Sequence, residues 1–552
     1  MNKKINIKKT KNEKILLYLI LFIVLIVGIF FRFSNLDGKV YWGDETVTSL
    51  RISGYTLEEL QQLAFNGEEI SVETLHKYQY PNLEKNWLDT VKGLAAEEPQ
   101  HPPFYFLMVK FWVRWFGNSV AVTRSFSAVI SLLAFPCLYW LCQELFNSSL
   151  TSSIAVALVA VSPFHLLYAQ EARSYSLWTV TILLASAALL RAMRLQTPSS
   201  WAIYSVTLAV GLYTYLLSGT IAIGHAIYVL IIEKFALSKT IKAYLLASLA
   251  AIIMFLPWII AVVNSVTEAD TTTSWTKLSF PLNYLIKTWM LNCSRIFVDF
   301  NYNFVNRNIF LYLIIIILIT LVAYSIYFLC CHTPKQAWLF ILTLIAVTAL
   351  VLVLPDLTWG GIRSSVARYL IPCYLGIEIA VAYLLANKIS ITKKQPQSWK
   401  VVTLILLFWG IISCAVSSRS EVWWNKYNAI HVPQLAQIVN QSDSSLVITS
   451  WHYLMIFSHV FNSQVKMQTG VHQPVSTTSE KNMGAVNSVK NNLDERDIFV
   501  HNSVEVVESI LKQAKNYYIE EVYNWKENIE PVYETKTKLW KVSKIRENTS
   551  ER

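Results

Sequence analysis

Long apolar runs separated by short polar segments fill the chain from Ile15 to about residue 417. Repeated apolar runs of about 17–25 residues are typical of helices that cross a membrane. The first run covers Ile15 to Phe31 and follows a basic start, MNKKINIKKTKNEK. It resembles a signal peptide, but no small-residue cleavage site follows it, so we expect an uncleaved first span.

Ten further spans are predicted, and their approximate ranges are 122–146, 150–168, 176–194, 200–217, 219–233, 243–263, 309–330, 336–354, 366–386 and 400–417. In this register the segments RAMR, EKFALSKTIK, HTPK and NKISITKKQPQSWK all face the cytoplasm, and each is basic, as the positive-inside rule requires. We therefore expect an α-helical, multi-pass protein of the inner or plasma membrane with about eleven transmembrane helices and an external C-terminus.

Two parts of the chain have no long apolar run. The first external loop, 34–121, contains an acidic stretch, and within it TLEELQQLAF and LEKNWLDTVKGLA have helical spacing. HPPFYFLMVKFWVRWFG is too short for a span and predicts an interfacial helix. After residue 419, SLVITSW, DIFVH and KLWKVSKI predict strands, and VEVVESILKQAKN predicts a helix. We therefore divide the chain into a transmembrane catalytic module, 1–419, and a small external (periplasmic) α/β domain, 420–552.

Composition and charge support a membrane protein and exclude a nucleic-acid partner. The chain is 54% hydrophobic and 15% charged, whereas a soluble chain has about 25% charged residues. The net charge is +11, but residues 421–552 hold 14 basic and 15 acidic residues. The excess therefore lies in the membrane part, where the positive-inside rule explains it. Seven cysteines show neither a disulfide framework nor zinc-ligand spacing.

The segment YWGDETVTSL, 41–50, places two acids directly after the first span. One interpretation is that Asp44 is a helix N-cap, which does not account for Glu45. The other is a partly desolvated carboxylate that takes a proton from an acceptor hydroxyl. The residues alone leave both interpretations open.

Two further segments carry candidate groups. In EEPQHPPFYF, 97–106, His101 either caps a helix that begins at the prolines or faces the same outer surface as Asp44. In SPFHLLYAQEARSYS, 162–176, a membrane-level turn contains Glu171 and Arg173. Charges there are costly unless paired or used. The two residues either form a local pair, with Arg173 also able to snorkel to lipid, or bind and orient a substrate phosphate, with Glu171 helping to hold a metal.

A fourth segment, TWGGIRSSVARYLIP, 358–372, places Arg363, Arg368 and Tyr369 just outside a span. Anchoring at lipid headgroups is common for such residues, whereas the planar arginine fork also suits bidentate phosphate binding. In the predicted topology all four segments lie on one external face. Acids and arginines gathered there suit a substrate that is half lipid and half polar, such as a lipid-phosphate-linked sugar.

Taken in order, these segments resemble a known family. They are RF at 32–33, W-x-D-E at 42–45, HPPFY at 101–105, FGNSVAVTR at 116–124, SPFHLLYAQEARSY at 162–175 and ARYLIP at 367–372. The pattern, which covers roughly 30–420, resembles the GT-C glycosyltransferases (family 39-like), in particular the bacterial relatives of protein O-mannosyltransferases and of the lipid A aminoarabinose transferase. Gly43 and the polar insert 66–96 depart from it.

The resemblance implies transfer of a hexose or pentose, with inversion, from a polyprenyl-phosphate donor to a lipid, glycan or protein acceptor outside the membrane. It implies Asp44 as the catalytic base, with Glu45 completing the pair. The residues that would bind the substrate and its phosphate are His101, Glu171, Arg173, Tyr175, Arg363, Arg368 and Tyr369. Asp44 and Glu171 would be the ligands of a divalent metal, Mg or Mn, whose presence the resemblance leaves open.

Three rival functions remain. A lipid or oligosaccharide transporter would place charges at the midplane and often has internal repeats, whereas the candidate charges here lie at one face and no repeat is visible. A non-catalytic envelope scaffold would use 420–552 as a binding module. An O-antigen-type ligase would use a diphosphate-linked donor.

Overall fold

A computed structural model of the protein describes residues 2–66, 68–302, 309–391, 396–469, 496–513, 517–529 and 533–544. The chain divides into two compact units. The helical unit consists of Met1–Leu36, Leu94–Trp112 and Ser119–Ser420. The sheet unit consists of Asp37–Gly93, Val113–Asn118 and Glu421–Arg552.

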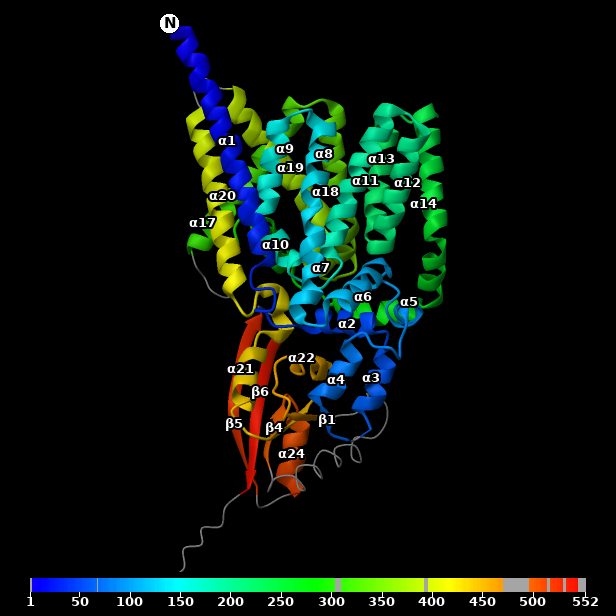
Figure 1. Ribbon diagram of the computed structural model, residues 1–552, viewed down its shortest axis with the longest axis vertical. Helices are drawn as coiled ribbons and strands as arrows, with labels where there is room; N and C mark the ends of the chain where they lie inside the picture. The colour runs from blue at the N-terminus through cyan, green and yellow to red at the C-terminus, as the bar shows by residue number, and fades with distance from the viewer. Residues whose placement is uncertain are drawn as a thin grey trace, which may run out of the picture. The chain divides into compact units, whose positions relative to one another are not determined.

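The helical unit is built from long apolar helices and a few short ones (Figure 1). The helices that coincide with the predicted spans are α1 (Asn2–Phe33), α7 (Val120–Leu132), α8 (Ala134–Phe146), α9 (Ser149–Ala160), α10 (Pro163–Ala169), α11 (Tyr175–Leu195), α12 (Pro198–Thr214), α13 (Ser218–Ile232), α14 (Lys239–Asn264), α17 (Ile309–His332), α18 (Lys335–Thr358), α19 (Ile371–Ile391) and α20 (Pro396–Arg419). The other elements are α6 (Phe104–Phe116), α15 (Val266–Thr273), α16 (Leu282–Ser294), η1 (Ser274–Lys277), η2 (Arg363–Ser365) and η3 (Ala367–Leu370).

All eleven predicted spans coincide with helical segments. Within the described ranges, eight helices are long and apolar enough to cross a membrane, and α9 with α10, bent by 61° at their break, makes a ninth if the pair is counted as one span. The remaining two, α12 and α13, have 17 and 15 residues, fewer than the ~20 that a straight crossing needs. The structure confirms a polytopic helical membrane protein and shows that two of its predicted spans are short.

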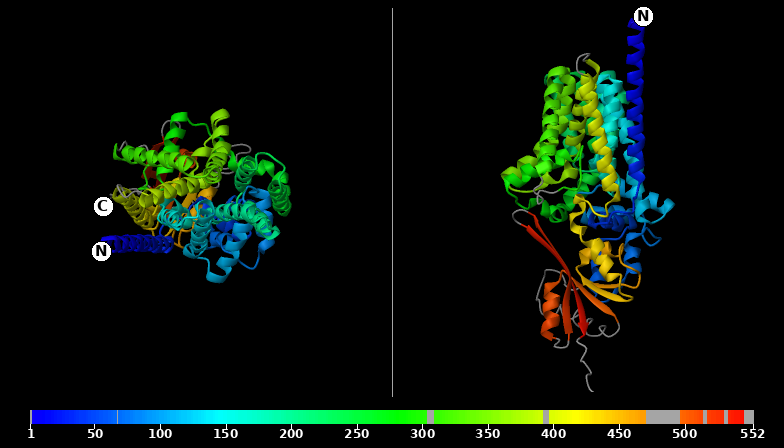
Figure 2. Two further views of the ribbon diagram at one scale, coloured as in Figure 1. Left: turned by 90° about the horizontal axis from the view of Figure 1, so that it is seen from above. Right: turned by 90° about the vertical axis from the view of Figure 1, so that its left-hand side faces the viewer.

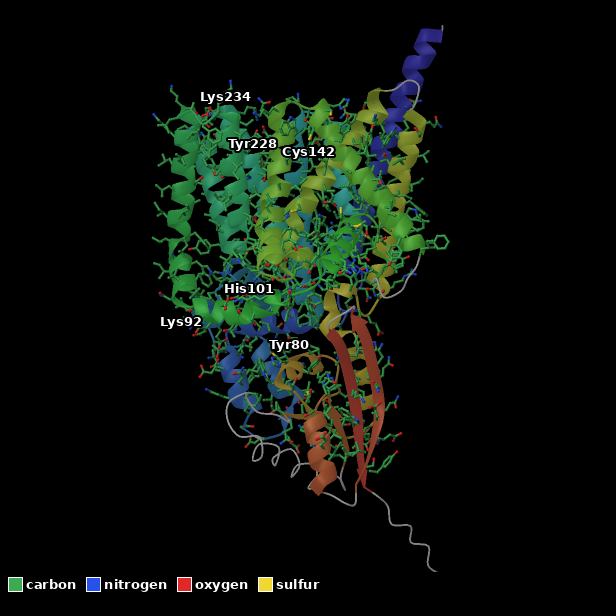
Figure 3. All side chains as sticks on the ribbon, turned by 180° about the vertical axis from the view of Figure 1, so that it is seen from behind. Tyr80, Lys92, His101, Cys142, Tyr228 and Lys234 are labelled. Atoms are coloured by element: carbon green, nitrogen blue, oxygen red, sulfur yellow. The ribbon has the colours of Figure 1, made fainter. Side chains whose placement is uncertain are left out.

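Helix α19 lies in the middle of the helical unit. It packs against α9, α17, α18 and α20 and is the most buried of the eight candidate spans. Helices α1 and α17 lie to one side and α12 to α14 to the other (Figure 1), and the end-on view shows the same grouping (Figure 2, left). His101 lies near one end of this bundle and Lys234 at the other (Figure 3), as the predicted topology requires.

The sheet unit is an α/β structure, as predicted. Its six-stranded sheet has the order β1-β3-β2-β4-β6-β5, with β2 parallel to β3 and β4, and β6 antiparallel to β4 and β5. The long strands β5 and β6 run side by side (Figure 2, right). The strands are β1 (Ile70–Ser71), β2 (Ser445–Thr449), β3 (Lys466–Thr469), β4 (Asp497–His501), β5 (Tyr517–Ile529) and β6 (Tyr533–Lys544). The helices are α2 (Gly43–Ser53), α3 (Leu57–Ala64), α4 (Val72–Gln79), α21 (Val432–Val439), α22 (Trp451–Phe457) and α24 (Val504–Gln513), and α5 (Trp87–Glu97) crosses the boundary at Gly93.

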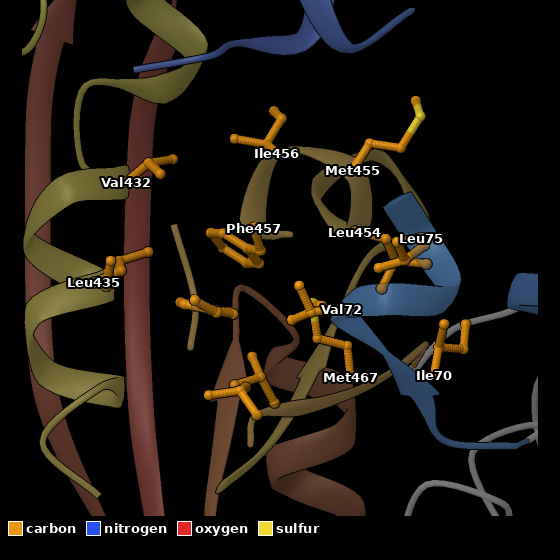
Figure 4. Close-up of a cluster of buried hydrophobic side chains, with 14 of the residues drawn as sticks. Ile70, Val72, Leu75, Val432, Leu435, Leu454, Met455, Ile456, Phe457 and Met467 are labelled. Carbon is orange, nitrogen blue, oxygen red and sulfur yellow. The ribbon is translucent and has the colours of Figure 1, made fainter. Parts of the chain in front are cut away.

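The first loop contributes Asp37–Gly93 to the sheet unit, whereas the sequence analysis grouped this loop with the transmembrane module. Ile70 of β1 pairs with Met467 of β3 in an antiparallel register. Leu75 of α4 packs in the same buried cluster as Met467 and Leu454 (Figure 4). The amphipathic helices of the loop bury their apolar faces here, because a helix with one apolar face needs a partner that covers it.

Leu75 tests whether the two segments share one core. It is completely buried, whereas Leu83 in the same loop is 97% exposed. We expect Leu75→Ala to lower the free energy of unfolding of the sheet unit by about 2–5 kcal/mol, and Leu83→Ala to change it by about 0.5 kcal/mol or less. Limited proteolysis of the full-length protein in detergent, at rising urea concentration, measures this. Cleavage within 37–93 while 421–544 stays protected would show that there are two separate cores.

A buried histidine pair makes the sheet unit sensitive to acid. Burial lowers the pKa of His431 to about 4, and burial together with the nearby His431 lowers the pKa of His501 to about 3. Both are therefore neutral in the folded unit, while in the unfolded chain they titrate at about 6.5. The unfolded state binds more protons below that value, so stability should fall as the pH drops from about 6.5 to 5 and stay level above it. Urea unfolding at pH 7.5, 6.5, 5.5 and 5.0 measures this, and replacing both histidines by Gln should flatten the profile.

Candidate active site

The turn that joins α10 to α11 brings four predicted site residues together in the helical unit. Arg173 is only 5% exposed, and its Nη2 lies 3.2 Å from Nε2 of His101. The backbone N–H of Arg173 donates to the carbonyl of Glu171 at 2.8 Å, which closes the turn. Glu171 and Tyr175 are buried as well. His101 thus contacts Arg173 from a segment 72 residues earlier, which fixes the direction of the guanidinium group.

Arg368 lies beside the ring of Tyr175, the residue at which α11 begins after this turn. Its guanidinium carbon lies 5.9 Å from the centroid of Tyr175, 5.6 Å from that of Tyr369 and 5.7 Å from that of Trp275. Tyr215 joins the group, with ring centroids 5.9 Å from Tyr175 and 6.4 Å from Tyr369. Aromatic faces attract a cation and hold a planar guanidinium in place. Two arginines and their aromatic neighbours therefore form one cluster, which we call the arginine cluster.

Arg363 has a different environment from Arg368, although the two are five residues apart. Its Nη1 lies 3.0 Å from Oδ1 of Asp356, a fully buried carboxylate. Oδ2 of Asp356 accepts 2.7 Å hydrogen bonds from both the backbone N–H and the hydroxyl of Ser364. This arrangement holds the turn after α18 and favours a structural role for Arg363. Phosphate binding by Arg363 stays a prediction.

The acidic pair lies in the first turn of α2 in the sheet unit. The N-cap of α2 is Trp42, which forms no side-chain capping bond. The interpretation of Asp44 as the N-cap is therefore wrong, since Asp44 lies inside the helix at its second position. A carboxylate in the first turn interacts favourably with the helix dipole, and Asp44 remains half-buried.

Glu45 points into the sheet unit and meets a lysine that the sequence did not single out. Its Oε2 lies 2.5 Å from Nζ of Lys426, and the two side chains are 0% and 1% exposed. Lys426 also lies 5.7 Å from the ring centroid of Trp42. A buried charge is tolerated only when it is paired. Glu45 therefore anchors α2 beside Asp44, and this geometry favours a positioning role over direct participation in the reaction.

The sequence predicts Asp44 and Glu171 as possible ligands of a divalent metal. Within the described ranges, no three His, Cys, Asp or Glu side chains are grouped so as to hold a metal ion, and the two candidate ligands, Asp44 and Glu171, belong to different units. One further pair of ionisable side chains was not singled out from the sequence. His165 and Glu378 meet inside the helical unit, and the lone acid in the apolar run GIEIAVAYLL was the available signal.

The Glu45–Lys426 pair yields a direct test. Lys426→Met removes the cation beside a fully buried carboxylate, so the free energy of unfolding of the sheet unit should fall by about 3–5 kcal/mol. The double variant Glu45→Gln/Lys426→Met should recover most of this loss, because no buried charge remains. Lys541→Met is the matched control, since Lys541 pairs with Asp497 on the surface and should cost about 1 kcal/mol or less. Urea unfolding measures all three, and strictly additive single effects would contradict the pairing.

Comparisons with known proteins identify the fold. Residues 100–260 match the Dolichyl-phosphate-mannose-protein mannosyltransferase family, and the sequence matches no curated protein. A crystal structure of ArnT from Cupriavidus metallidurans bound to undecaprenyl phosphate is similar over 96% of this chain and 98% of its own, at 12% identity and a TM-score of 0.51. The oligosaccharyltransferase of Archaeoglobus fulgidus, in complex with Zn and sulfate, is similar over 78% and 65% of the two chains, at 14% identity and a TM-score of 0.45. Residues 100–260 are therefore similar to the protein mannosyltransferases, and nearly the whole chain shares the fold of ArnT.

Proposed function

We propose that this protein transfers a sugar from a polyprenyl-phosphate donor to an acceptor hydroxyl on the external face of the membrane, with inversion at the sugar. The observation that carries the proposal is the arginine cluster, in which Arg173 contacts His101 and Arg368 shares the Tyr175 ring. The arginine fork fits phosphate oxygens in a bidentate manner. The complex of ArnT with undecaprenyl phosphate supports the same class of ligand.

The arginine cluster accounts for departure of the leaving group. As the bond from the sugar C1 to the phosphate oxygen breaks, the electron pair stays on the phosphate and its negative charge grows. Arg173 and Arg368 bind and stabilise this developing charge, and buried donors are most effective because they are already oriented. His101 holds the Arg173 guanidinium in its direction, so less reorganisation is needed during the reaction.

Asp44 is the proposed base. The acceptor hydroxyl attacks C1 from the side opposite the phosphate, and its proton moves to the Asp44 carboxylate as the new C–O bond forms. The Glu45–Lys426 pair fixes the first turn of α2 and so limits the positions that Asp44 can take.

The external location rests on the charge of the loops. His101, which contacts Arg173, lies at the end of the helical unit opposite Lys234 (Figure 3). Lys234 belongs to the basic segment EKFALSKTIK, which the positive-inside rule assigns to the cytoplasm. The arginine cluster therefore faces outward in the proposed orientation. A ligase with a diphosphate-linked donor is the alternative within the same fold.

Replacement of Asp44 tests the proposal. We expect Asp44→Asn to lower turnover by about 10²–10⁴ with little change in KM for the donor, because the amide cannot accept the proton. Asp37→Asn is the control, since Asp37 is an exposed carboxylate seven residues earlier. The assay follows transfer by purified protein from polyprenyl-phosphate and polyprenyl-diphosphate sugars, with and without EDTA. Equal turnover by the Asp44→Asn variant would move the base elsewhere, and activity with the diphosphate alone would favour the ligase.

A further inference from the structure

An ionised carboxylate is costly inside a membrane protein, yet α19 carries Glu378 in its middle. Glu378 lies in the candidate span Ala367–Ser390, and its Oε2 lies 2.8 Å from Nε2 of His165 on α10. Their side chains are 1% and 6% exposed. Ionisable groups at such depth are retained when they have a specific role, and the proposed reaction assigns none to this pair.

The position of α10 depends on contacts with its neighbours. It has seven residues, too few for a helix to persist by its own hydrogen bonds. At its start, Arg32 donates to the carbonyls of Val159 at 3.1 Å and Ala160 at 2.6 Å, where α9 ends. At its end, the Gln170 amide donates to the carbonyls of Phe31 at 2.7 Å and Ser34 at 2.8 Å. These contacts tie the end of α9, just before α10, and the end of α10 to α1 and the residues that follow it.

The His165–Glu378 pair adds a polar tie between α10 and α19. In the described part of the chain, Oε1 of Glu378 has no hydrogen-bond partner, so His165 is the group that orients the carboxylate. Beside the pair, Phe164 of α10 packs edge-on against Tyr374 of α19, with ring centroids 4.8 Å apart. Residues 374 and 378 are one turn apart and share a face of α19, so an apolar and a polar contact meet there.

Each helix of this pair leads to one arginine of the arginine cluster. His165 precedes Arg173 by eight residues through α10 and its closing turn, and Glu378 follows Arg368 by ten residues through η3 and α19. Ten helical residues correspond to about 15 Å. A slide or tilt of α10 against α19 would therefore change the separation of the two guanidinium groups directly.

We propose that the His165–Glu378 pair is a positioning device that sets the spacing of Arg173 and Arg368. This inference rests on the proposed function, in which both arginines bind the donor phosphate. The pair itself touches no substrate. A purely structural ion pair would stabilise the helical unit without altering the affinity of correctly folded protein for phosphate, and this difference separates the two roles.

The test measures the Kd of a short-chain polyprenyl phosphate for full-length protein in detergent, together with KM and kcat for the sugar donor. In His165→Leu/Glu378→Leu both partners are replaced by apolar groups, so the fold should survive. We expect Kd and KM to rise about tenfold or more, because small misplacements of binding groups are costly. Glu378→Gln keeps an oxygen that accepts from His165 and should stay within about threefold of wild type.

Further variants keep the inference falsifiable. If the double variant does not fold, Glu378→Asp replaces it, because it keeps the charge and shortens the side chain, and Kd should again rise. His225→Leu is the control for loss of a buried imidazole, since His225 contacts Ser186 and Tyr204 instead, and its Kd should not change. Suppose that the folded double variant and Glu378→Asp both bind with the wild-type Kd while Arg173→Lys binds more weakly. The positioning role of the pair is then wrong, and the proposed function is not affected. No binding by wild-type protein overturns the proposed function and this inference with it.

Discussion

The helical unit depends on one constraint, which is that backbone carbonyls out of reach of water must accept hydrogen bonds from other groups of the protein. Where α9 stops and α10 begins, the last carbonyls of α9 have no partners within the helix, and the membrane interior supplies no water. Arg32 donates to two of them, and the thiol of Cys414 donates to the carbonyl of Val161 at 3.3 Å. Gly28 lets α1 approach the carbonyl of Ala160, since a Cβ there would collide with it. The helix can therefore be interrupted between α9 and α10. The turn that contains Arg173 comes after α10 and depends on this interruption.

In the sheet unit, a buried ion pair is the corresponding stabilising interaction. The Glu45–Lys426 contact joins a helix of the first loop to the segment that follows the last predicted span. The same two regions share a hydrophobic core and a pair of strands. A loop that is polar in sequence is thus part of one compact unit with the C-terminal segment.

Local patterns predicted most of the fold and the outline of the site. Long apolar runs located all eleven helical segments, because a run of that length is characteristic of a membrane-spanning helix. The QEAR turn and His101 were predicted on the same external face, and the structure shows that Arg173 of this turn contacts His101. Contacts between residues far apart in the sequence could not be predicted. No local signal connects Ile70 with Met467. None connects Glu45 with Lys426 either, and these two residues are 381 positions apart. Arg32 belongs to the RF motif, but only the structure shows that it donates hydrogen bonds to the last carbonyls of α9.

The proposed function requires that the protein break the bond between a sugar and a polyprenyl phosphate. Mass spectrometry can follow the lipid after purified wild-type protein has been incubated with polyprenyl-phosphate hexoses and pentoses. Envelope lipids and glycans serve as acceptors in this experiment. We expect free polyprenyl phosphate in a one-to-one ratio with sugar found on the acceptor. If the donor is bound, or moved across a vesicle membrane, without any release of polyprenyl phosphate, the proposed function is wrong and the protein is a transporter.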